Sequence, residues 1–181
     1  SFLAEELHRS ILSQIAPGCA KTTTGALEAA FEDVNAKIRS AQLRGGSTAL
    51  VLCAMPTTTI GADDGCTGTT IDKAVWCANC GDTRAVLFTL HGSLARISVD
   101  HTPDAAGETE RVEALGGQVE FNCLDGVLEI CRGFGDFDLV GMTAVPHIAR
   151  VDSNVICSSA FSAAGSSDDR VYVLLASDGL W

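Results

Sequence analysis

The order of helix-like and strand-like segments is the feature that most restricts what this chain can fold into. Apolar residues recur at helical spacing in residues 2–15 and again in residues 27–38, which predicts two amphipathic helices. Beyond residue 46 the chain changes to short segments rich in β-branched residues and bounded by turn residues. We expect strands at residues 47–55, 73–79, 84–90, 94–98, 118–121, 127–130 and 170–176.

One more helix and two loops complete the predicted order. Residues 108–115 have a short amphipathic pattern that ends at Gly116 and Gly117. Residues 56–70 and 158–169 are rich in small and polar residues, and we interpret both as loops. The chain thus has two helices first, and then many strands with one further helix among them. This order is typical of an α+β fold. It differs from the regular alternation of strand and helix in a parallel sheet.

Size, charge and cysteine content exclude several classes of protein. A chain of 181 residues is long enough for one domain with its own core. Its 12 Lys and Arg against 23 Asp and Glu give a net charge of −11, without a basic stripe, so we expect no nucleic-acid partner. No apolar run approaches the roughly 20 residues that cross a bilayer, so we expect no membrane segment.

Eight dispersed cysteines, mostly in apolar stretches, are typical of reduced thiols in an intracellular protein.

Three aspartates lie beside glycine at the ends of expected strands. They are Asp82, Asp136 and Asp178. Each by itself is an ordinary turn residue, but together they would suit a hard divalent cation such as Mg²⁺ or Mn²⁺. Arg84 and Arg132 lie close in sequence to the first two. We expect each arginine to form an ion pair with its neighbouring aspartate, with phosphate binding as the alternative.

The pair Cys77 and Cys80 has the spacing of a zinc knuckle or a redox motif. A zinc site needs a second pair of ligands, and His91 and His101 are not at a recognised spacing from it. Residues three apart on a strand also point to opposite faces. We therefore expect structural cysteines, with a thiol or zinc module as a weaker alternative. His101 is expected to order the loop before the helix at 108–115.

Six segments carry a recognisable pattern when they are taken in chain order. They read GSTA at 46–49, VWCANCGDTRAVL at 75–87, SVDHTP at 98–103, ETERVEALGGQV at 108–119, DGVLEICRGFGDFD at 125–138 and VYVLLASDGLW at 171–181. In order and spacing they resemble the metal-dependent protein phosphatases of type 2C, over about residues 1–181. The resemblance implies a four-layer αββα sandwich, in which two antiparallel sheets pack face to face and helices flank each.

The resemblance also implies an activity and a set of ligands. The family hydrolyses phosphoserine and phosphothreonine in phosphoproteins, using Mg²⁺ or Mn²⁺ to activate a water that attacks phosphorus directly. Asp178 matches the aspartate of the family's SDGLW motif, a metal ligand. Asp82 matches the aspartate of the GD(S/T)R motif, which is associated with a third, weaker metal position.

Parts of the family's site are not matched within residues 1–181. The family's DGHGG segment precedes the stretch that resembles residues 1–7, and a further acidic residue and an Asp-Asn motif follow SDGLW. We therefore expect a single phosphatase-like domain that lacks the N-terminal and C-terminal metal motifs, with no catalytic residue of its own. Glu129 also stands where a small residue is usual. The alternative is a catalytically inactive pseudophosphatase domain that serves as a binding or structural component of a larger assembly.

Overall fold

The computed structural model describes residues 2–16, 22–60, 69–90, 94–152 and 171–181. Its elements are α1 (Phe2–Gln14), α2 (Thr23–Ser40), β1 (Gly46–Ser47), β2 (Ala49–Ile60), β3 (Thr69–Cys80), β4 (Arg84–Thr89), β5 (Leu94–Arg96), α3 (Glu108–Ala114), β6 (Val119–Glu120), β7 (Cys123–Leu124), β8 (Phe134–Gly135), β9 (His147–Asp152), β10 (Val171–Ala176) and the 3₁₀ turn η1 (Asp178–Leu180). The three predicted helices are all present, although α2 begins four residues before the predicted start at residue 27.

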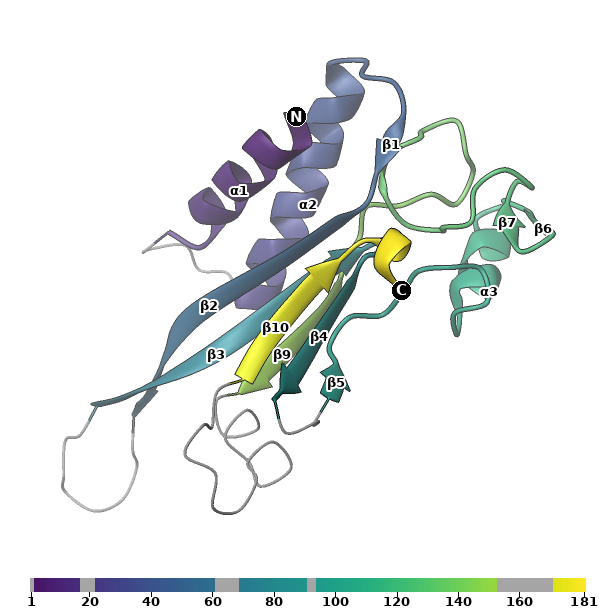
Figure 1. Ribbon diagram of the computed structural model, residues 1–181. Coiled ribbons are helices and arrows are strands. Elements are labelled where there is room, and N and C mark those ends of the chain that lie inside the picture. The colour runs from purple at the N-terminus through teal and green to yellow at the C-terminus, as the bar shows by residue number, and fades with distance from the viewer. Residues whose placement is uncertain (1, 17–21, 61–68, 91–93, 153–170) are drawn as a thin grey trace.

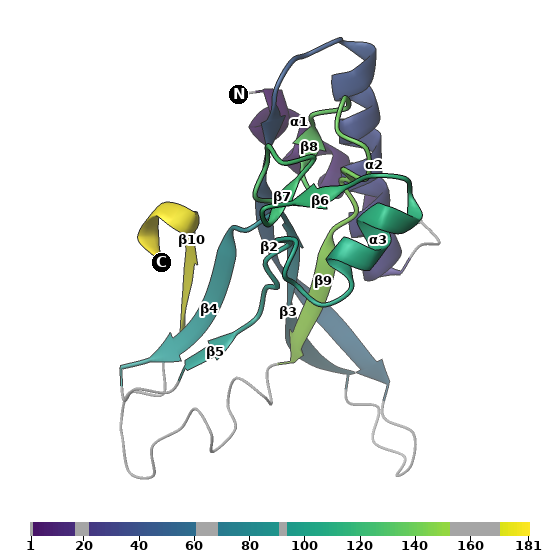
Figure 2. The same cartoon turned by 90° about the vertical axis from the view of Figure 1, so that its right-hand side faces the viewer.

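Two antiparallel sheets and a pair of helices form the body of the molecule. One sheet has the order β2-β3-β9 and the other the order β10-β4-β5. Helices α1 and α2 cover the outer face of the first sheet (Figure 1). The two sheets approach each other where β3 leads into β4 and diverge toward their other ends (Figure 2). The α+β fold is thus confirmed, and the described residues supply three of its four expected layers.

The helix pair packs on the first sheet through a continuous apolar core. The Thr22 side chain caps α2 by accepting a hydrogen bond from the Gly25 backbone N–H at 3.1 Å. Phe31 of α2 meets Phe134 with ring centroids 5.2 Å apart. Alternate residues of β3 face this core, as the two-residue period of a strand requires, and they are Trp76, Ala78 and Cys80.

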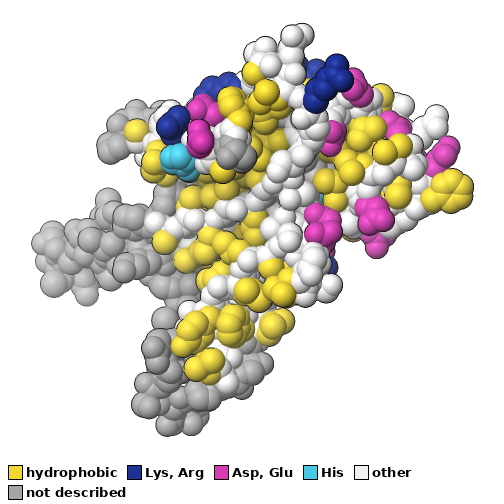
Figure 3. Space-filling view, turned by 45° about the horizontal axis from the view of Figure 1, so that its top comes forward, with side chains coloured by type: hydrophobic (Ala, Val, Ile, Leu, Met, Phe, Trp, Pro, Cys, Tyr) yellow, Lys and Arg dark blue, Asp and Glu magenta, His cyan; other side chains and the backbone are white. Residues whose placement is uncertain are grey.

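Hydrophobic side chains also remain on the surface of the described part of the chain. Figure 3 shows them gathered beside α1 and across the neighbouring strands. Val173, Leu174 and Leu175 of β10 are each more than a third exposed. None of the described helices has the length and apolar character that crossing a membrane requires.

The prediction of a loop over residues 56–70 is wrong at both ends, where the structure has strand. Strands β2 and β3 continue as a paired hairpin as far as Ile60 opposite Thr69. The threonines in these ends are β-branched, which favours the extended backbone of a strand over a loop. The centre of the expected loop, 61–68, and the second expected loop, 158–169, lie outside the described residues.

The strands after residue 120 also differ from the prediction. Residues 127–130 form no strand, and Leu128 makes only an isolated bridge to Leu124. The chain reverses just before them, at Asp125 and Gly126, both of which have positive φ. In contrast, three strands were not predicted: the short strands β7 and β8, and β9 at His147–Asp152, which forms one edge of the first sheet.

Gly81, between β3 and β4, is a position where only glycine fits. Its φ is +108°, and a Cβ there would lie 2.3 Å from Thr48 Cγ2. We expect Gly81→Ala to lower the free energy of unfolding by about 2 kcal/mol, measured by urea denaturation. Gly107→Ala is the matched control, because Gly107 also has positive φ (+82°) but has open space around it. An equal loss of stability in both variants would contradict the steric part of this prediction.

Candidate metal centre

The pairing of β4 with β10 brings two of the predicted ligands to the same edge of the second sheet. Arg84, the first residue of β4, is directly opposite Ala176, the last residue of β10. Asp82 lies two residues before Arg84, and Asp178 lies two residues after Ala176. The antiparallel register therefore delivers both carboxylates to one end of the strand pair.

The environment of Asp82 is electronegative. Partial burial raises the pKa of the Asp82 carboxyl, and the charges of Asp178, Asp100 and Glu129 raise it further, against a lowering by a backbone hydrogen bond. Of these neighbours, sequence reasoning assigned only Asp178 to the site. These like charges disfavour ionised Asp82, and a cation bound to its carboxylate would offset them.

Asp178 is held in the turn η1. Its Oδ1 accepts a hydrogen bond from the Gly179 N–H at 2.9 Å, and its side chain is otherwise open to solvent. Trp181 folds back so that its Nε1 donates to the Ala176 carbonyl at 3.3 Å, and the Arg84 guanidinium lies 5.4 Å from the centre of the indole ring. These contacts fix the turn on the end of β4 and β10.

Asp136, the third strand-end aspartate, occupies a different place. It follows β8, which pairs with β1 and contacts α2. Its carboxylate packs on Gly46, where a Cβ would come within 1.9 Å of Asp136 Oδ2. The structure thus brings together two of the three aspartates that the sequence singled out.

The expected ion pair between Arg84 and Asp82 is wrong. Arg84 instead donates to Asp100 Oδ2, at 3.0 Å from Nε and 2.7 Å from Nη2, and its Nε also lies 3.4 Å from Oδ1. Arg96 contacts the same carboxylate. Asp100 is the better partner because Arg84 reaches it through two nitrogens, Nε and Nη2. Asp82 is left available for another ligand.

The expected ion pair between Arg132 and Asp136 is also wrong. Arg132 binds both oxygens of Glu108, and Arg111 donates to Glu108 Oε2 at 2.9 Å. Only 5% of the Glu108 side chain is exposed. Burial raises the pKa of Glu108, but hydrogen bonds from Arg132 and Arg111 outweigh it and lower that pKa to about 2. Sequence reasoning missed this cluster.

His101 has the structural role that the sequence predicts. Its side chain is 1% exposed, and its Nδ1 lies 3.0 Å from the Gly81 carbonyl oxygen. Its own carbonyl accepts from the Cys131 N–H at 2.7 Å. Nearby, Asn79 donates to the Val99 carbonyl at 2.7 Å. These bonds hold the segment before α3 against the turn that carries Asp82.

Stability should fall on acidification in two steps. Burial, aided by the charge of Arg132, lowers the pKa of His101 to about 4, so the unfolded chain binds a proton first as the pH falls below 6.5. The stability from neutral His101, about 3 kcal/mol, is complete above pH 6.5 and is lost toward pH 4. His147, whose pKa burial also lowers, adds to the same step. The contribution of Glu108 is lost below its usual pKa of 4.5.

Urea denaturation at several pH values between 7 and 3 measures this dependence. His101→Gln should flatten the step between pH 6.5 and 4, whereas His8→Gln, on the exposed surface of α1, should leave it unchanged. An unaltered pH slope in His101→Gln would contradict the assignment.

Cys77 and Cys80 do not form a joint site. Cys80 faces the helix core, whereas Cys77, three residues earlier on the same strand, faces the other way. Burial raises the pKa of Cys77 to about 11 and that of Cys80 to about 12, so both thiols stay protonated. Among the residues that the structure describes, no three His, Cys, Asp or Glu side chains gather to hold a metal ion.

Asp82 and Asp178 fit part of a site for a hard divalent cation. Both supply carboxylate oxygens, which Mg²⁺ and Mn²⁺ prefer, and Asp82 lies among like charges that a cation would neutralise. Mg²⁺ sites in proteins commonly use only one or two carboxylates together with waters and substrate phosphate. The two aspartates therefore suit such an ion as a partial ligand set.

A family model described as protein phosphatase 2C matches residues 2–181. The chain belongs to the protein phosphatase 2C family. The mouse protein named probable protein phosphatase 1N is 31% identical over 159 residues, which cover 86% of this chain and 34% of that protein. The rice protein named probable protein phosphatase 2C 68 is 40% identical over 114 residues, covering 61% of this chain and 28% of that protein. This chain thus spans about a third or less of these relatives.

Solved structures agree on the fold of this protein phosphatase 2C chain. The crystal structure of a phosphatase from Toxoplasma gondii has a TM-score of 0.64 and 22% identity, covering 83% of this chain and 54% of that one. A Caenorhabditis elegans sex determining protein has a TM-score of 0.62 and 20% identity, covering 83% of this chain and 36% of that one. The mixed helix and sheet arrangement is therefore that of the family.

Proposed function

We propose that this chain is the central part of a protein serine/threonine phosphatase that uses Mg²⁺ or Mn²⁺ to hydrolyse phosphoproteins. Its membership of the protein phosphatase 2C family supports the reaction class. The observation that carries the metal assignment is the register of β4 with β10, which delivers Asp82 and Asp178 to one end of the strand pair.

The charges at this end of the sheet support a role for a cation. The Asp82 carboxylate feels the negative charges of Asp178, Asp100 and Glu129, and the two aspartates without an ion pair among the described residues, Asp82 and Asp178, would repel a phosphate dianion in the absence of a cation. Asp82 and Asp178 would hold the cation, which when bound lowers the pKa of a coordinated water and polarises a phosphoryl oxygen. The ion pairs that Asp100 forms with Arg84 and Arg96 fix the start of β4 and keep Asp82 free for this role.

Release of phosphate from a phosphothreonine peptide by the full-length protein tests this function. We expect turnover in the presence of Mn²⁺ and its loss on chelation with EDTA. A folded protein that neither binds Mn²⁺ nor releases phosphate would refute the proposed phosphatase activity. It would instead favour the second candidate, a catalytically inactive phosphatase-like domain within a larger assembly.

Two further features belong to this proposal. We take residues 1–181 as part of a single phosphatase domain, because α1, α2 and the first sheet share one core. We also place the protein inside the cell, since the five described cysteines are free thiols. The net charge of −11 supports phosphoproteins or protein partners over nucleic acid.

A further inference from the structure

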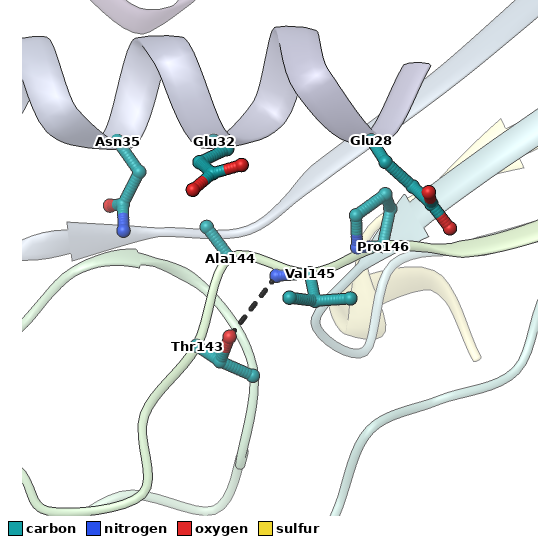
Figure 4. A pocket seen from close by; sticks show the side chains of 7 residues that line it. All are labelled: Glu28, Glu32, Asn35, Thr143, Ala144, Val145 and Pro146. Carbon is teal, nitrogen blue, oxygen red and sulfur yellow. Dashed lines mark hydrogen bonds between the residues drawn. The ribbon is translucent and has the colours of Figure 1, made fainter. Parts of the chain in front are cut away.

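A groove between α2 and residues 143–146 lies outside the metal centre and is not built as a site. Glu28 and Glu32 lie along its helix side, whereas Val145 points away from α2 (Figure 4). The two neighbours of Val145 in the sequence are buried, so they present no accessible apolar wall to the glutamates. The metal centre, in contrast, has a contact that joins its two ligand-bearing segments.

This contact is made by Arg84, which connects the strand after Asp82 with the turn that carries Asp178. Arg84 is the first residue of β4 and lies directly opposite Ala176, the last residue of β10. The turn η1 continues from the end of β10 (Figure 1). The centre of the Trp181 indole ring, at the end of this turn, lies 5.4 Å from the Arg84 guanidinium.

The turn that holds Asp178 has little else to keep it in place. Residues 177–181 are all exposed, and their backbone hydrogen bonds, at 3.2 Å and 3.0 Å, run between residues of the turn itself. The Trp181 Nε1 donates to the Ala176 carbonyl, from which the turn continues. These bonds shape the turn but attach it to no element beyond β10. The contact with Arg84 adds an attachment to β4.

Asp100 fixes the position from which Arg84 reaches the indole ring. Nε and Nη2 of Arg84 donate to Asp100 Oδ2 at 3.0 Å and 2.7 Å. The Asp100 side chain is only 15% exposed, so this ion pair is less screened by solvent than a surface pair. Two bonds to one carboxylate also fix the plane of the guanidinium. The distance of 5.4 Å to the ring centre is within the range of a cation–π interaction.

Arg96 provides a comparison within the same cluster. It also contacts Asp100, and its Nε donates to the Ser98 carbonyl at 2.8 Å. Among the cation–π contacts of the described residues, the Trp181 ring is paired with Arg84 and not with Arg96. Removing Arg96 therefore takes a positive charge and an ion pair from Asp100 but leaves the ring contact in place.

We propose that Arg84 is a positioning residue that holds Asp178 beside Asp82 through the ring of Trp181. Asp100 orients the guanidinium, and the guanidinium holds the indole ring and with it the turn η1. Without this contact the like charges of Asp178 and Asp82 drive the turn away from β4, and the two carboxylates no longer share an ion. The inference rests on the proposed metal-dependent function, but the contact itself forms without a cation.

Hydrogen exchange on the metal-free, full-length protein, measured by mass spectrometry on the millisecond scale, tests the contact itself. Arg84→Met should speed exchange of the amides of residues 178–181 by at least about fivefold, because loss of the ring contact lets the turn open more often. Arg96→Met should leave these rates within about twofold, since Arg84 then still binds Asp100.

Titration calorimetry with Mn²⁺ tests the positioning of Asp178. Each arginine variant removes one positive charge, which by itself favours a bound cation. We nevertheless expect Arg84→Met to weaken Mn²⁺ binding by about fivefold, and Arg96→Met to leave the affinity within about twofold or raise it. In a Trp181→Leu background, Arg84→Met should cause no further loss beyond about twofold, because Arg84 acts through that ring.

Three results would overturn the proposal. They are unaltered exchange rates or Mn²⁺ affinity in Arg84→Met, an equal effect of the two arginine variants, or losses of Mn²⁺ affinity that multiply when Arg84→Met and Trp181→Leu are combined. Weaker binding of inorganic phosphate to Arg84→Met, with unaltered exchange, would assign Arg84 to phosphate binding instead. A protein that binds no Mn²⁺ would refute the proposed function, whereas exchange in the metal-free protein would still decide whether Arg84 holds the turn.

Discussion

Replacing Glu108 by glutamine should lower the free energy of unfolding by about 3–5 kcal/mol, because it leaves two largely buried arginines without their counter-charge. Arg132 and Arg111 are only 19% and 24% exposed, and both donate to this carboxylate. For a chain of this length the melting temperature should fall by about 10 °C. Urea and thermal denaturation at pH 7 measure both effects.

A neighbouring glutamate provides the matched control. Glu110 is on the same helix but exposed, so Glu110→Gln should change stability by less than about 0.5 kcal/mol. Adding Arg132→Met to Glu108→Gln should restore part of the lost free energy of unfolding, because one of the two unpaired positive charges is then removed. Equal stability of Glu108→Gln and Glu110→Gln would show that the cluster does not hold α3 in place.

Asp178→Asn should have the largest effect on function. If Asp178 holds the proposed cation, its replacement should weaken Mn²⁺ binding by at least about tenfold and lower phosphate release by about a hundredfold, because a catalytic cation provides several kcal/mol of transition-state stabilisation. Isothermal titration calorimetry and a phosphothreonine-peptide assay on the same samples measure the two quantities.

The control for this change is Asp138→Asn. Asp138 is exposed on the segment after β8, away from the pair formed by Asp82 and Asp178, and its replacement should leave both quantities within about twofold. Unchanged Mn²⁺ affinity in Asp178→Asn, in a protein that still turns over, would remove Asp178 from the metal site.

Local patterns in the sequence predict the helices well. In α2 the core positions such as Phe31 and Val34 recur at helical spacing, whereas the cap at Thr22 is known only from the structure. The strands are harder, because pairing partners decide where a strand ends. Residues 127–130 have strand composition but follow a tight turn, whereas β9 depends on its pairing with β3.

The site divides in the same way between local and long-range features. Asp82 and Asp178 stand out from short motifs, and the pairing of β4 with β10 then brings them to one end of the second sheet. The partners of the arginines depend on the tertiary fold. Glu108 is 24 residues from Arg132, and an acidic residue in the first turn of a helix is too common to indicate burial.

A double-mutant cycle on Mn²⁺ binding tests most directly whether Asp82 and Asp178 form one metal site. Calorimetry would compare the full-length protein with Asp82→Asn, Asp178→Asn and the double variant. If both carboxylates hold the same ion, the double variant should lose less affinity than the sum of the single losses, by at least about 1 kcal/mol. Strictly additive losses would contradict a shared site at the end of β4 and β10.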